Sequence, residues 1–346
     1  MQTVLYTGRL FSRAIANGIF SSVLGVPEQQ SSNNSTTPSG SSTSSSCSSS
    51  SSGPNNTIVN ASRSAGKRLR FLTAASGFSK NHHTAAAVAA AVRPGKFGDD
   101  AYFIARHALA DVIGVADGVG GWRAWGIDPG EFSHSLMVTC ERLVVTGSFS
   151  PSEPGAIIAR AYYELLENKS HILGSSTACV VVLQGEALRL SSANIGDSGF
   201  LVVRDGTVVH RSQEQQHYFN TPFQLSLPPP GTSQHVLSDR PESALRGEFS
   251  VREGDMLMVA TDGVFDNLPD SLIIKELIKL LSSPKFSTKS MHIYACGDHK
   301  RKGNFDELYM LINGFCGRPH KARRSGINYP GGKPDDITVV LATMTV

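Results

Sequence analysis

Aspartates in short clusters are the residues of this chain best suited to chemistry. Four such clusters lie in its C-terminal three-quarters, and these are Gly98-Asp99-Asp100, Asp117-Gly118, Asp262-Gly263 and Asp335-Asp336. Carboxylates that are brought together repel one another unless a hard divalent cation neutralises them. Oxygen ligands without His or Cys suit magnesium, manganese or calcium. The pattern therefore predicts a divalent-cation site, provided that the fold brings these clusters together.

Two of the clusters come directly after apolar runs that predict buried strands. Val112–Ala116 precedes Asp117, and Met256–Ala260 leads through Thr261 into Asp262. A carboxylate in such a place is held at the edge of a sheet. The glycine after each aspartate lets the backbone turn sharply and brings a carbonyl oxygen close.

The remaining elements indicate how a fold could position the clusters. Apolar runs predict strands at Tyr102–Ala105, Asp111–Ala116, Ser176–Leu183, Ala187–Asn194, Phe200–Arg204, Thr207–Arg211, Met256–Ala260 and Ile337–Thr343. Helices are predicted at 130–147, 154–168, 270–282 and 304–316. Asp205-Gly206 is the strongest hairpin signal in the chain. Hairpin-linked strands bracketed by pairs of helices favour an α+β sandwich with antiparallel sheets over alternating βαβ units.

Composition excludes several classes of protein. The chain has 346 residues, a formal net charge of +3, and five scattered cysteines with no CxxC pair, which argues against a disulfide framework and against a zinc site. No run of about 18 apolar residues is present, so we expect no transmembrane segment. The basic cluster Lys67-Arg68-Leu69-Arg70 lacks the stacking aromatics of a nucleic-acid surface, so we expect no nucleic-acid partner.

The N-terminal part differs in composition from the rest. Before Asp99 the only acidic residue is Glu28. Residues 1–25 are Arg-containing and acid-free and can form an amphipathic helix. This pattern is typical of a mitochondrial transit peptide, which we expect at residues 1–30, although a disordered basic terminus would look similar. Residues 31–92 include a long Ser-rich stretch that cannot bury a core, and we expect them to form a linker. The folded domain is then expected at 93–346.

The order of the acidic motifs resembles that of the metal-dependent type 2C Ser/Thr protein phosphatases, over about residues 93–346. The matching segments are Gly98–Ala101, Ala116–Gly121, Gly174–Ala178, Asn194–Ser198, Ala260–Asn267 and Lys333–Thr338. The segment Gln215–Leu225 is further similar to the mitochondrial branch of that family. Each motif alone is weak evidence, but all six together, in the order found in that family, are specific to it.

The resemblance implies a fold, a reaction and a set of ligands. The fold would be a four-layer αββα sandwich of two mainly antiparallel sheets flanked by helices. The reaction would be hydrolysis of phosphoserine and phosphothreonine on protein substrates by a water molecule activated between two divalent ions, Mn²⁺ or Mg²⁺. The ion ligands would be Asp100, Asp117, the Gly118 carbonyl, Asp262 and Asp335, of which Asp117, Asp262 and Asp335 are the catalytic set. A mitochondrial monomer is the default expectation.

Three departures from the family pattern qualify this expectation. Val119 stands where many relatives have a His that protonates the leaving group. The phosphate-binding Arg has no clean match, and Arg93 and Lys96 are the nearest candidates. Ile172 and Leu173, where some relatives carry an acidic residue, put a third metal ion in doubt.

Two other functions stay open at this point. A pseudophosphatase would keep the fold and bind phosphoproteins without turnover, but the intact Asp117, Asp262 and Asp335 argue against it. A calcium-stabilised binding module is a further alternative, although the dense Asp/Asn loop of a calcium hand is missing. For Asp197, Asp266, Asn267 and His217 we expect structural roles.

Overall fold

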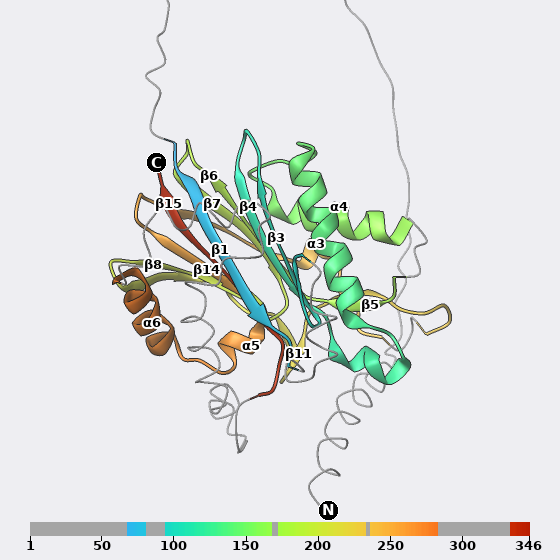
Figure 1. Cartoon of the computed structure of the whole chain (residues 1–346). Helices are drawn as coiled ribbons and strands as arrows, with labels where there is room; N and C mark the ends of the chain where they lie inside the picture. Colours follow the sequence, from blue (N-terminus) through green and yellow to red (C-terminus); the bar gives the residue numbers. More distant parts are fainter. Residues whose placement is uncertain (1–67, 81–93, 168–171, 233–235, 283–332) are drawn as a thin grey trace, which may run out of the picture.

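Two antiparallel sheets packed face to face form the centre of the computed structural model, and helices cover their outer faces (Figure 1). The structure describes residues 68–80, 94–167, 172–232, 236–282 and 333–346. The helix predicted at 304–316 lies outside these residues. No helix among them is long and apolar enough to cross a membrane.

One sheet has six strands in the order β13-β7-β6-β4-β3-β2. They are β13 (Leu245–Ser250), β7 (Arg189–Ile195), β6 (Ala178–Gln184), β4 (Asp111–Asp117), β3 (Asp100–Arg106) and β2 (Lys96–Phe97). The other sheet has five strands in the order β1-β15-β14-β8-β9. They are β1 (Arg70–Phe78), β15 (Ile337–Thr345), β14 (Met256–Ala260), β8 (Gly199–Arg204) and β9 (Thr207–Arg211). Two short pairs complete the description, β10 (Gln216–Tyr218) with β11 (Thr221–Pro222), and β5 (Gly174–Ser176) with β12 (Leu225–Leu227).

Helices α3 (Pro129–Val145) and α4 (Pro154–Glu167) cover the six-stranded sheet, and α5 (Asp262–Phe265) and α6 (Asp270–Ser282) lie against the five-stranded sheet. Helix α3 begins where the sequence predicts, because Asp128 Oδ1 accepts a hydrogen bond from the Gly130 amide at 3.0 Å and Pro129 occupies the first turn. Short 3-10 turns lie at η1 (Gly120–Trp125) and η3 (Pro241–Ser243).

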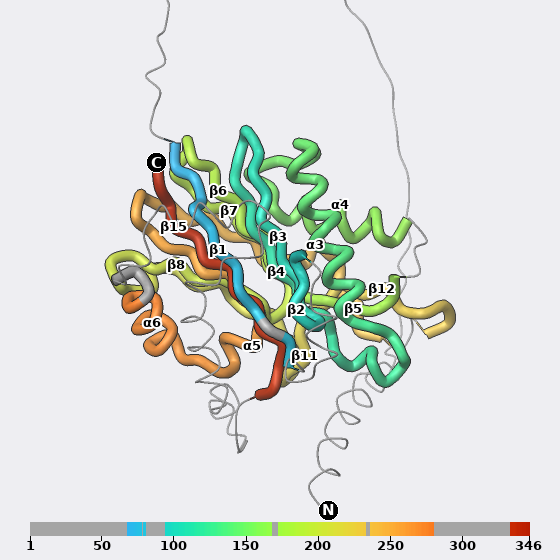
Figure 2. The backbone as a smooth tube through the Cα atoms, in the orientation of Figure 1, coloured from blue at the N-terminus to red at the C-terminus, as the bar shows by residue number. Residues whose placement is uncertain are grey.

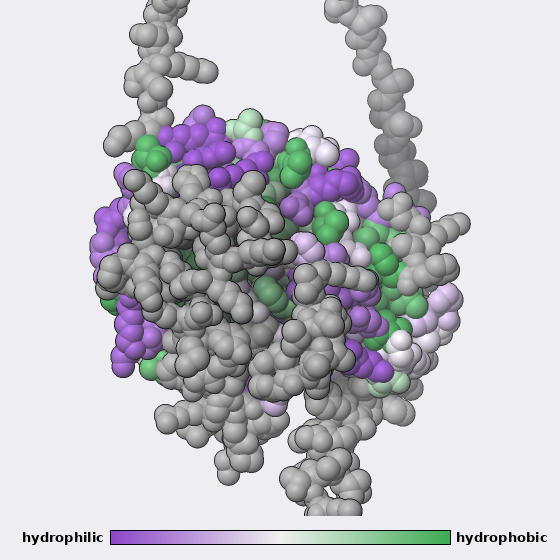
Figure 3. Space-filling model, in the orientation of Figure 1, coloured by the Kyte–Doolittle hydropathy of each residue, from purple (hydrophilic) through white to green (hydrophobic). Residues whose placement is uncertain are grey.

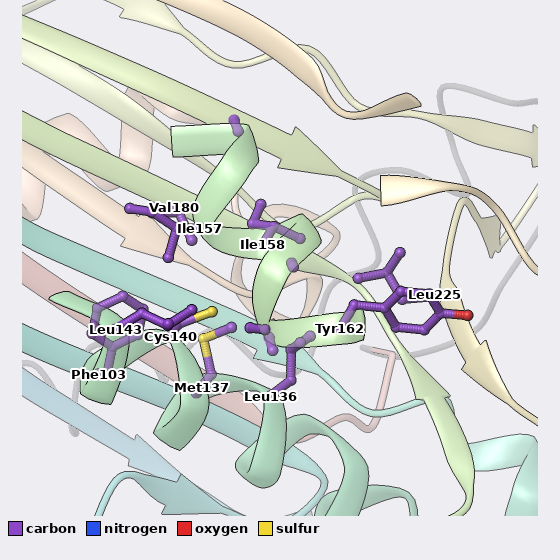
Figure 4. Packing of buried hydrophobic residues seen from close by; sticks show 14 of the residues in the cluster. Phe103, Leu136, Met137, Cys140, Leu143, Ile157, Ile158, Tyr162, Val180 and Leu225 are labelled. Atoms are coloured by element: carbon purple, nitrogen blue, oxygen red, sulfur yellow. The ribbon is translucent and has the colours of Figure 1, made fainter. Parts of the chain in front are cut away.

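Three apolar clusters fill the spaces between the four layers. The first lies between the six-stranded sheet and its helices, where Leu136 and Cys140 of α3 and Ile158 of α4 face Phe103 and Val180 (Figure 4). The second lies between the two sheets, and the third lies between the five-stranded sheet and helices α5 and α6. The arrangement confirms the expected αββα sandwich.

The burial of β4 and β6 explains why they carry continuous apolar runs. Both lie inside a sheet that is covered by helices on one face and by the second sheet on the other, so all but the last residue of each is buried. The outer faces of α3 and α4 turn to solvent, and their exposed apolar side chains include Val138, Val145 and Leu166. On the face drawn in Figure 3, hydrophilic side chains occupy much of the described surface around smaller hydrophobic patches.

Strand β1 corrects the domain boundary expected from the sequence. It lies inside the segment 31–92 that we expected to be a linker, yet it pairs with β15 along its whole length, from Arg70 opposite Thr345 to Phe78 opposite Ile337. Figure 2 shows these two segments side by side, although they come from opposite ends of the folded chain. The folded domain therefore includes β1, so it does not begin at residue 93.

Candidate active site

The acidic clusters meet at one end of the two sheets. Asp100 opposes Asp117 in the register of β3 with β4. Thr261 separates Asp262 from the end of β14. Strand β14 pairs with β15, and Asp335 lies just before the start of β15. The Thr261 hydroxyl donates a hydrogen bond to Asp100 Oδ2 at 2.7 Å and so joins the ends of the two sheets.

Asp117 and Gly118 are held by their main-chain atoms. The Asp117 amide donates to Thr177 Oγ1 at 3.0 Å, and the Asp117 carbonyl accepts from the Thr177 amide at 3.0 Å. The Gly118 amide donates to the Asp99 carbonyl at 3.1 Å. A Cβ at Gly118 would lie 2.6 Å from the Pro129 carbonyl oxygen, so only glycine fits between these backbones. The Asp117 side chain is therefore presented from the rigid end of β4.

The Asp336 carboxylate is a clamp that holds two backbone segments of the site together. It accepts hydrogen bonds from the amide of Lys80 at 2.7 Å and from the amide of Asp99 at 2.9 Å. The Lys80 ammonium lies 3.2 Å from Asp336 Oδ2 and 3.1 Å from Asp99 Oδ2. Gly98, just before Asp99, has a φ of 68°, a left-handed backbone conformation that favours glycine. Asp336 therefore ties the segment after β1 to the start of β3.

Asp262 and Asp335 meet around a lysine. The Lys333 ammonium contacts Asp262 Oδ2, lies 2.9 Å from Asp266 Oδ2 and lies 3.1 Å from Asp335 Oδ2. Gly263 allows this approach, because a Cβ there would lie 2.1 Å from the Asp336 carbonyl oxygen.

The electrostatics of the cluster favour a cation. Burial raises the pKa of Asp117 well above its usual range, and the neighbouring carboxylates of Asp262, Asp100 and Asp335 raise it further. Burial also raises the pKa of Asp100, and Asp336 adds to the effect. The pKa of Asp335 is raised to about 6 by burial and by Asp262, although Lys333 opposes the increase. Each of these shifts means that the ionised carboxylates need a compensating positive charge.

A divalent ion fits this set of donors. Asp100 Oδ1 is buried and accepts no hydrogen bond within the described part of the chain. The converging ligands are oxygens without imidazole or thiolate, as magnesium and manganese prefer. No group of three or more His, Cys, Asp or Glu side chains surrounds one point as a finished cage, as far as residues 68–80, 94–167, 172–232, 236–282 and 333–346 are concerned. The ammonium groups of Lys80 and Lys333 both lie near Asp335, at 3.6 Å and 3.1 Å, and balance part of the negative charge of the cluster.

The structure thus brings together Asp100, Asp117, Gly118, Asp262 and Asp335, which the sequence placed far apart. Of the two predicted phosphate-binding residues, Arg93 lies outside the described residues. The Lys96 ammonium lies at the N-terminus of α3, 3.0 Å from Glu131 and 3.6 Å from Asp128.

Three cationic residues at the site were missed by the sequence analysis. Lys80 falls in the segment that we expected to be a linker. Arg123 of η1 pairs with Asp99, and its side chain is 50% exposed. Lys333 belongs to a recognised motif, but nothing in the local pattern pairs it with residues near position 262. A positive charge in the otherwise acidic motif was the available signal.

Residues expected to be structural have the following contacts. Asp266, expected at a turn, contacts Lys333. Asn267 binds the Lys333 backbone. Asp197 accepts a hydrogen bond from Gln216 Nε2 at 3.0 Å.

His217 lies 3.0 Å from Asp239 Oδ2 and stacks on the Phe223 ring. These contacts account for a structural role of His217.

Comparison with known proteins identifies relatives over most of the chain. The chain is 55% identical over 246 residues to the protein phosphatase PTC7 homolog of Danio rerio, covering 71% of this chain and 81% of that protein. It is 54% identical over 246 residues to the PTC7 homolog of Homo sapiens, covering 71% and 79%. The PTC7 homolog fig of Drosophila melanogaster is 40% identical over 252 residues, with 72% and 78% covered.

Among solved structures, the photosystem II phosphatase PBCP matches with a TM-score of 0.55 and 25% identity, over 80% of this chain and 99% of that one. No protein-family model matches the chain.

Proposed function

This chain belongs to the PTC7-like branch of the metal-dependent type 2C Ser/Thr protein phosphatases, and from that premise we propose that its acidic cluster is the catalytic centre. The observation that carries the proposal is the convergence of Asp100, Asp117 and Asp262 at one end of the sandwich, where burial, together with the neighbouring carboxylates, raises the pKa values of Asp100 and Asp117. The substrates are phosphoserine and phosphothreonine side chains of proteins.

Each ligand has a defined position in this proposal. Asp117 and the Gly118 carbonyl would hold the first of two divalent ions, either Mn²⁺ or Mg²⁺, and Asp117 would also be a ligand of the second. Asp262 and Asp335 would hold the second ion, and Asp100 would hold bound water. Such ions would make a water molecule more acidic for attack on phosphorus and would neutralise charge on the phosphoryl oxygens.

The chain's own cations are suited to orienting the substrate. Arg123 presents a half-exposed guanidinium beside Asp99, and its planar fork matches phosphate geometry. Lys96 and Arg93 remain proposed phosphate-binding residues. Positioning and charge neutralisation supply most of the rate enhancement in phosphoryl transfer, so these groups matter even though they form no covalent bond.

No side chain at position 119 protonates the leaving group, because Val119 cannot donate a proton. Its amide donates a hydrogen bond to the Ser175 carbonyl at 2.9 Å, which fixes the loop beside Asp117. Another side chain or a water molecule therefore has to protonate the serine or threonine oxygen that departs.

Hydrolysis of a phosphothreonine peptide by the full chain tests the catalytic proposal. We expect turnover with Mn²⁺ or Mg²⁺ and none in chelator. Asp117→Asn is expected to lower kcat by a factor of about 10² or more, since it removes a charged ligand.

Asp205→Asn is the matched control. Asp205 lies at the hairpin turn between β8 and β9, and its side chain is 82% exposed. Full turnover of the chelated enzyme, or of Asp117→Asn, would refute the assignment.

We propose further that residues 1–30 direct the protein to mitochondria. Their Arg-containing, acid-poor composition, with Glu28 as the only acidic residue, supports this address. Imaging of the chain with a C-terminal tag, with and without residues 1–30, provides the test. A cytosolic signal from the full-length chain would contradict the proposal.

A further inference from the structure

Three carboxylates surround the ammonium group of Lys333. This ammonium contacts Asp262 and lies within 3.1 Å of the nearest carboxylate oxygens of Asp266 and Asp335. Only 24% of its side chain is exposed. Asp262 and Asp335 are the residues proposed above to hold the second ion, so the ammonium and that ion compete for the same two carboxylates.

Hydrogen bonds between the Lys333 backbone and the Asn267 side chain fix the position of Lys333. Its amide donates to Asn267 Oδ1 at 2.9 Å, and its carbonyl accepts from Asn267 Nδ2 at 3.0 Å. Asn267 Nδ2 also donates to the Gly263 carbonyl at 2.9 Å, so Lys333 is tied to the same turn that carries Asp262. Most exposed lysines lack such a restraint and contribute little through ion pairs.

We propose that Lys333 is a built-in counter-cation that holds Asp262 and Asp335 together in the metal-free protein, and that a divalent ion must displace it from both. Lys333 thereby sets the affinity of the site for its second ion. This inference rests on the proposed function, because it requires Asp262 and Asp335 to be ion ligands.

Asp266 provides a partner for the Lys333 ammonium after an ion has displaced it. It is buried at 4% exposure and contacts Lys333, but it is not among the proposed ion ligands. When an ion takes Asp262 and Asp335, the ammonium keeps the Asp266 carboxylate as a partner. The displaced charge therefore stays compensated inside the protein, which a buried ammonium requires.

Lys80 differs from Lys333 in its partners. It lies 3.1 Å from Asp99 and 3.2 Å from Asp336, and Asp336 already accepts two backbone amides. Its contact with Asp335 is longer, at 3.6 Å. Lys80 therefore belongs to the backbone clamp, and Lys333 alone of the two contacts both proposed ligands of the second ion.

Binding of Mn²⁺ to the full chain, measured by calorimetry, tests the inference with two variants. Lys333→Gln removes the competing charge, and we expect Mn²⁺ to bind at least about tenfold more tightly, since the ion no longer has to displace an ammonium group from Asp262 and Asp335. Lys333→Arg keeps the charge and is expected to bind Mn²⁺ no more tightly than the wild type. Lys279→Gln is the control, because Lys279 is exposed on α6 and pairs only with Glu276 among the contacts that the structure describes.

Thermal unfolding supplies a readout that does not depend on activity. In chelator, Lys333→Gln is expected to unfold at a temperature lower by roughly 3 °C or more, because three carboxylates lose a shared cation. Saturating Mn²⁺ is expected to remove most of this difference.

The outcomes separate the two claims. A wild-type chain that binds no Mn²⁺ would overturn the proposed function and the inference with it. A wild-type chain that binds Mn²⁺, beside a Lys333→Gln variant that binds it equally or more weakly, would overturn the inference about Lys333 alone.

Discussion

Deleting β1 is expected to unfold the catalytic domain. The strand buries Phe71 at 2% exposure and Leu72 at 6%, and Leu69 just before it is 2% exposed. Each such side chain contributes about 1.5–3 kcal/mol when fully buried, so their loss costs roughly 5–9 kcal/mol. A typical domain is stable by only about 5–15 kcal/mol, so the deletion removes most or all of the stability. Lys80, which donates its amide to Asp336, would also lose the strand that holds it in place.

Two truncated chains make the comparison. One lacks residues 1–66 and keeps β1, and the other lacks residues 1–78. We expect the first to retain the urea-unfolding midpoint and the phosphatase activity of the full chain. The second is expected to show no cooperative unfolding transition and no activity. Phe71→Ala in the full chain provides an intermediate case, with an expected loss of about 3–5 kcal/mol.

Cooperative unfolding of the shorter chain at an unchanged midpoint would show that β1 does not belong to the folded domain. Equal activity of the two truncated chains would contradict the coupling of this strand to the site.

Other changes test separate parts of the structure. Gly118→Ala places a Cβ 2.6 Å from a carbonyl oxygen of α3, so we expect a loss of about 1–3 kcal/mol in unfolding free energy and reduced activity. Burial lowers the pKa of His210, which stacks between Phe200 and Phe249. The unfolded chain therefore binds more protons than the folded one, and stability is lost as pH falls through about 6.5. His210→Gln should lose less stability than the wild type between about pH 7.5 and 5.5 in urea titrations. Val119→His is expected to raise kcat for phosphopeptides more than for aryl phosphates, whose leaving groups need little protonation. Equal effects on kcat for both substrates across pH would show that residue 119 does not face the leaving group.

The sequence predicted those elements whose signal is local. Strands β4 and β14 carry continuous apolar runs because they are covered on both faces, and the turn at Asp205 carries its own hairpin signal. Strand β1 lacks such a run, since Thr, Ala, Ser and Gly make up much of it, and its partner β15 lies at the far end of the chain. A strand whose stability comes from a distant partner has little local pattern to detect.

The candidate site shows the same limit at the level of single residues. The resemblance selected Asp100 and Asp335 as the ligands within the two pairs of adjacent aspartates, but it did not predict the contacts of Asp336. The Asp335 carboxylate contacts the Lys333 ammonium, whereas the Asp336 carboxylate accepts hydrogen bonds from the amides of Lys80 and Asp99. Such assignments depend on neighbours that only the fold supplies.

Anomalous X-ray diffraction from crystals of the full chain grown with Mn²⁺ tests the central claim most directly. We predict two manganese peaks roughly 3.5–4 Å apart, as in other two-metal phosphatases. The carboxylates of Asp117, Asp262 and Asp335 and the carbonyl of Gly118 should ligate them. Manganese bound elsewhere, or no manganese at the cluster of a chain that hydrolyses phosphopeptides, would contradict the account.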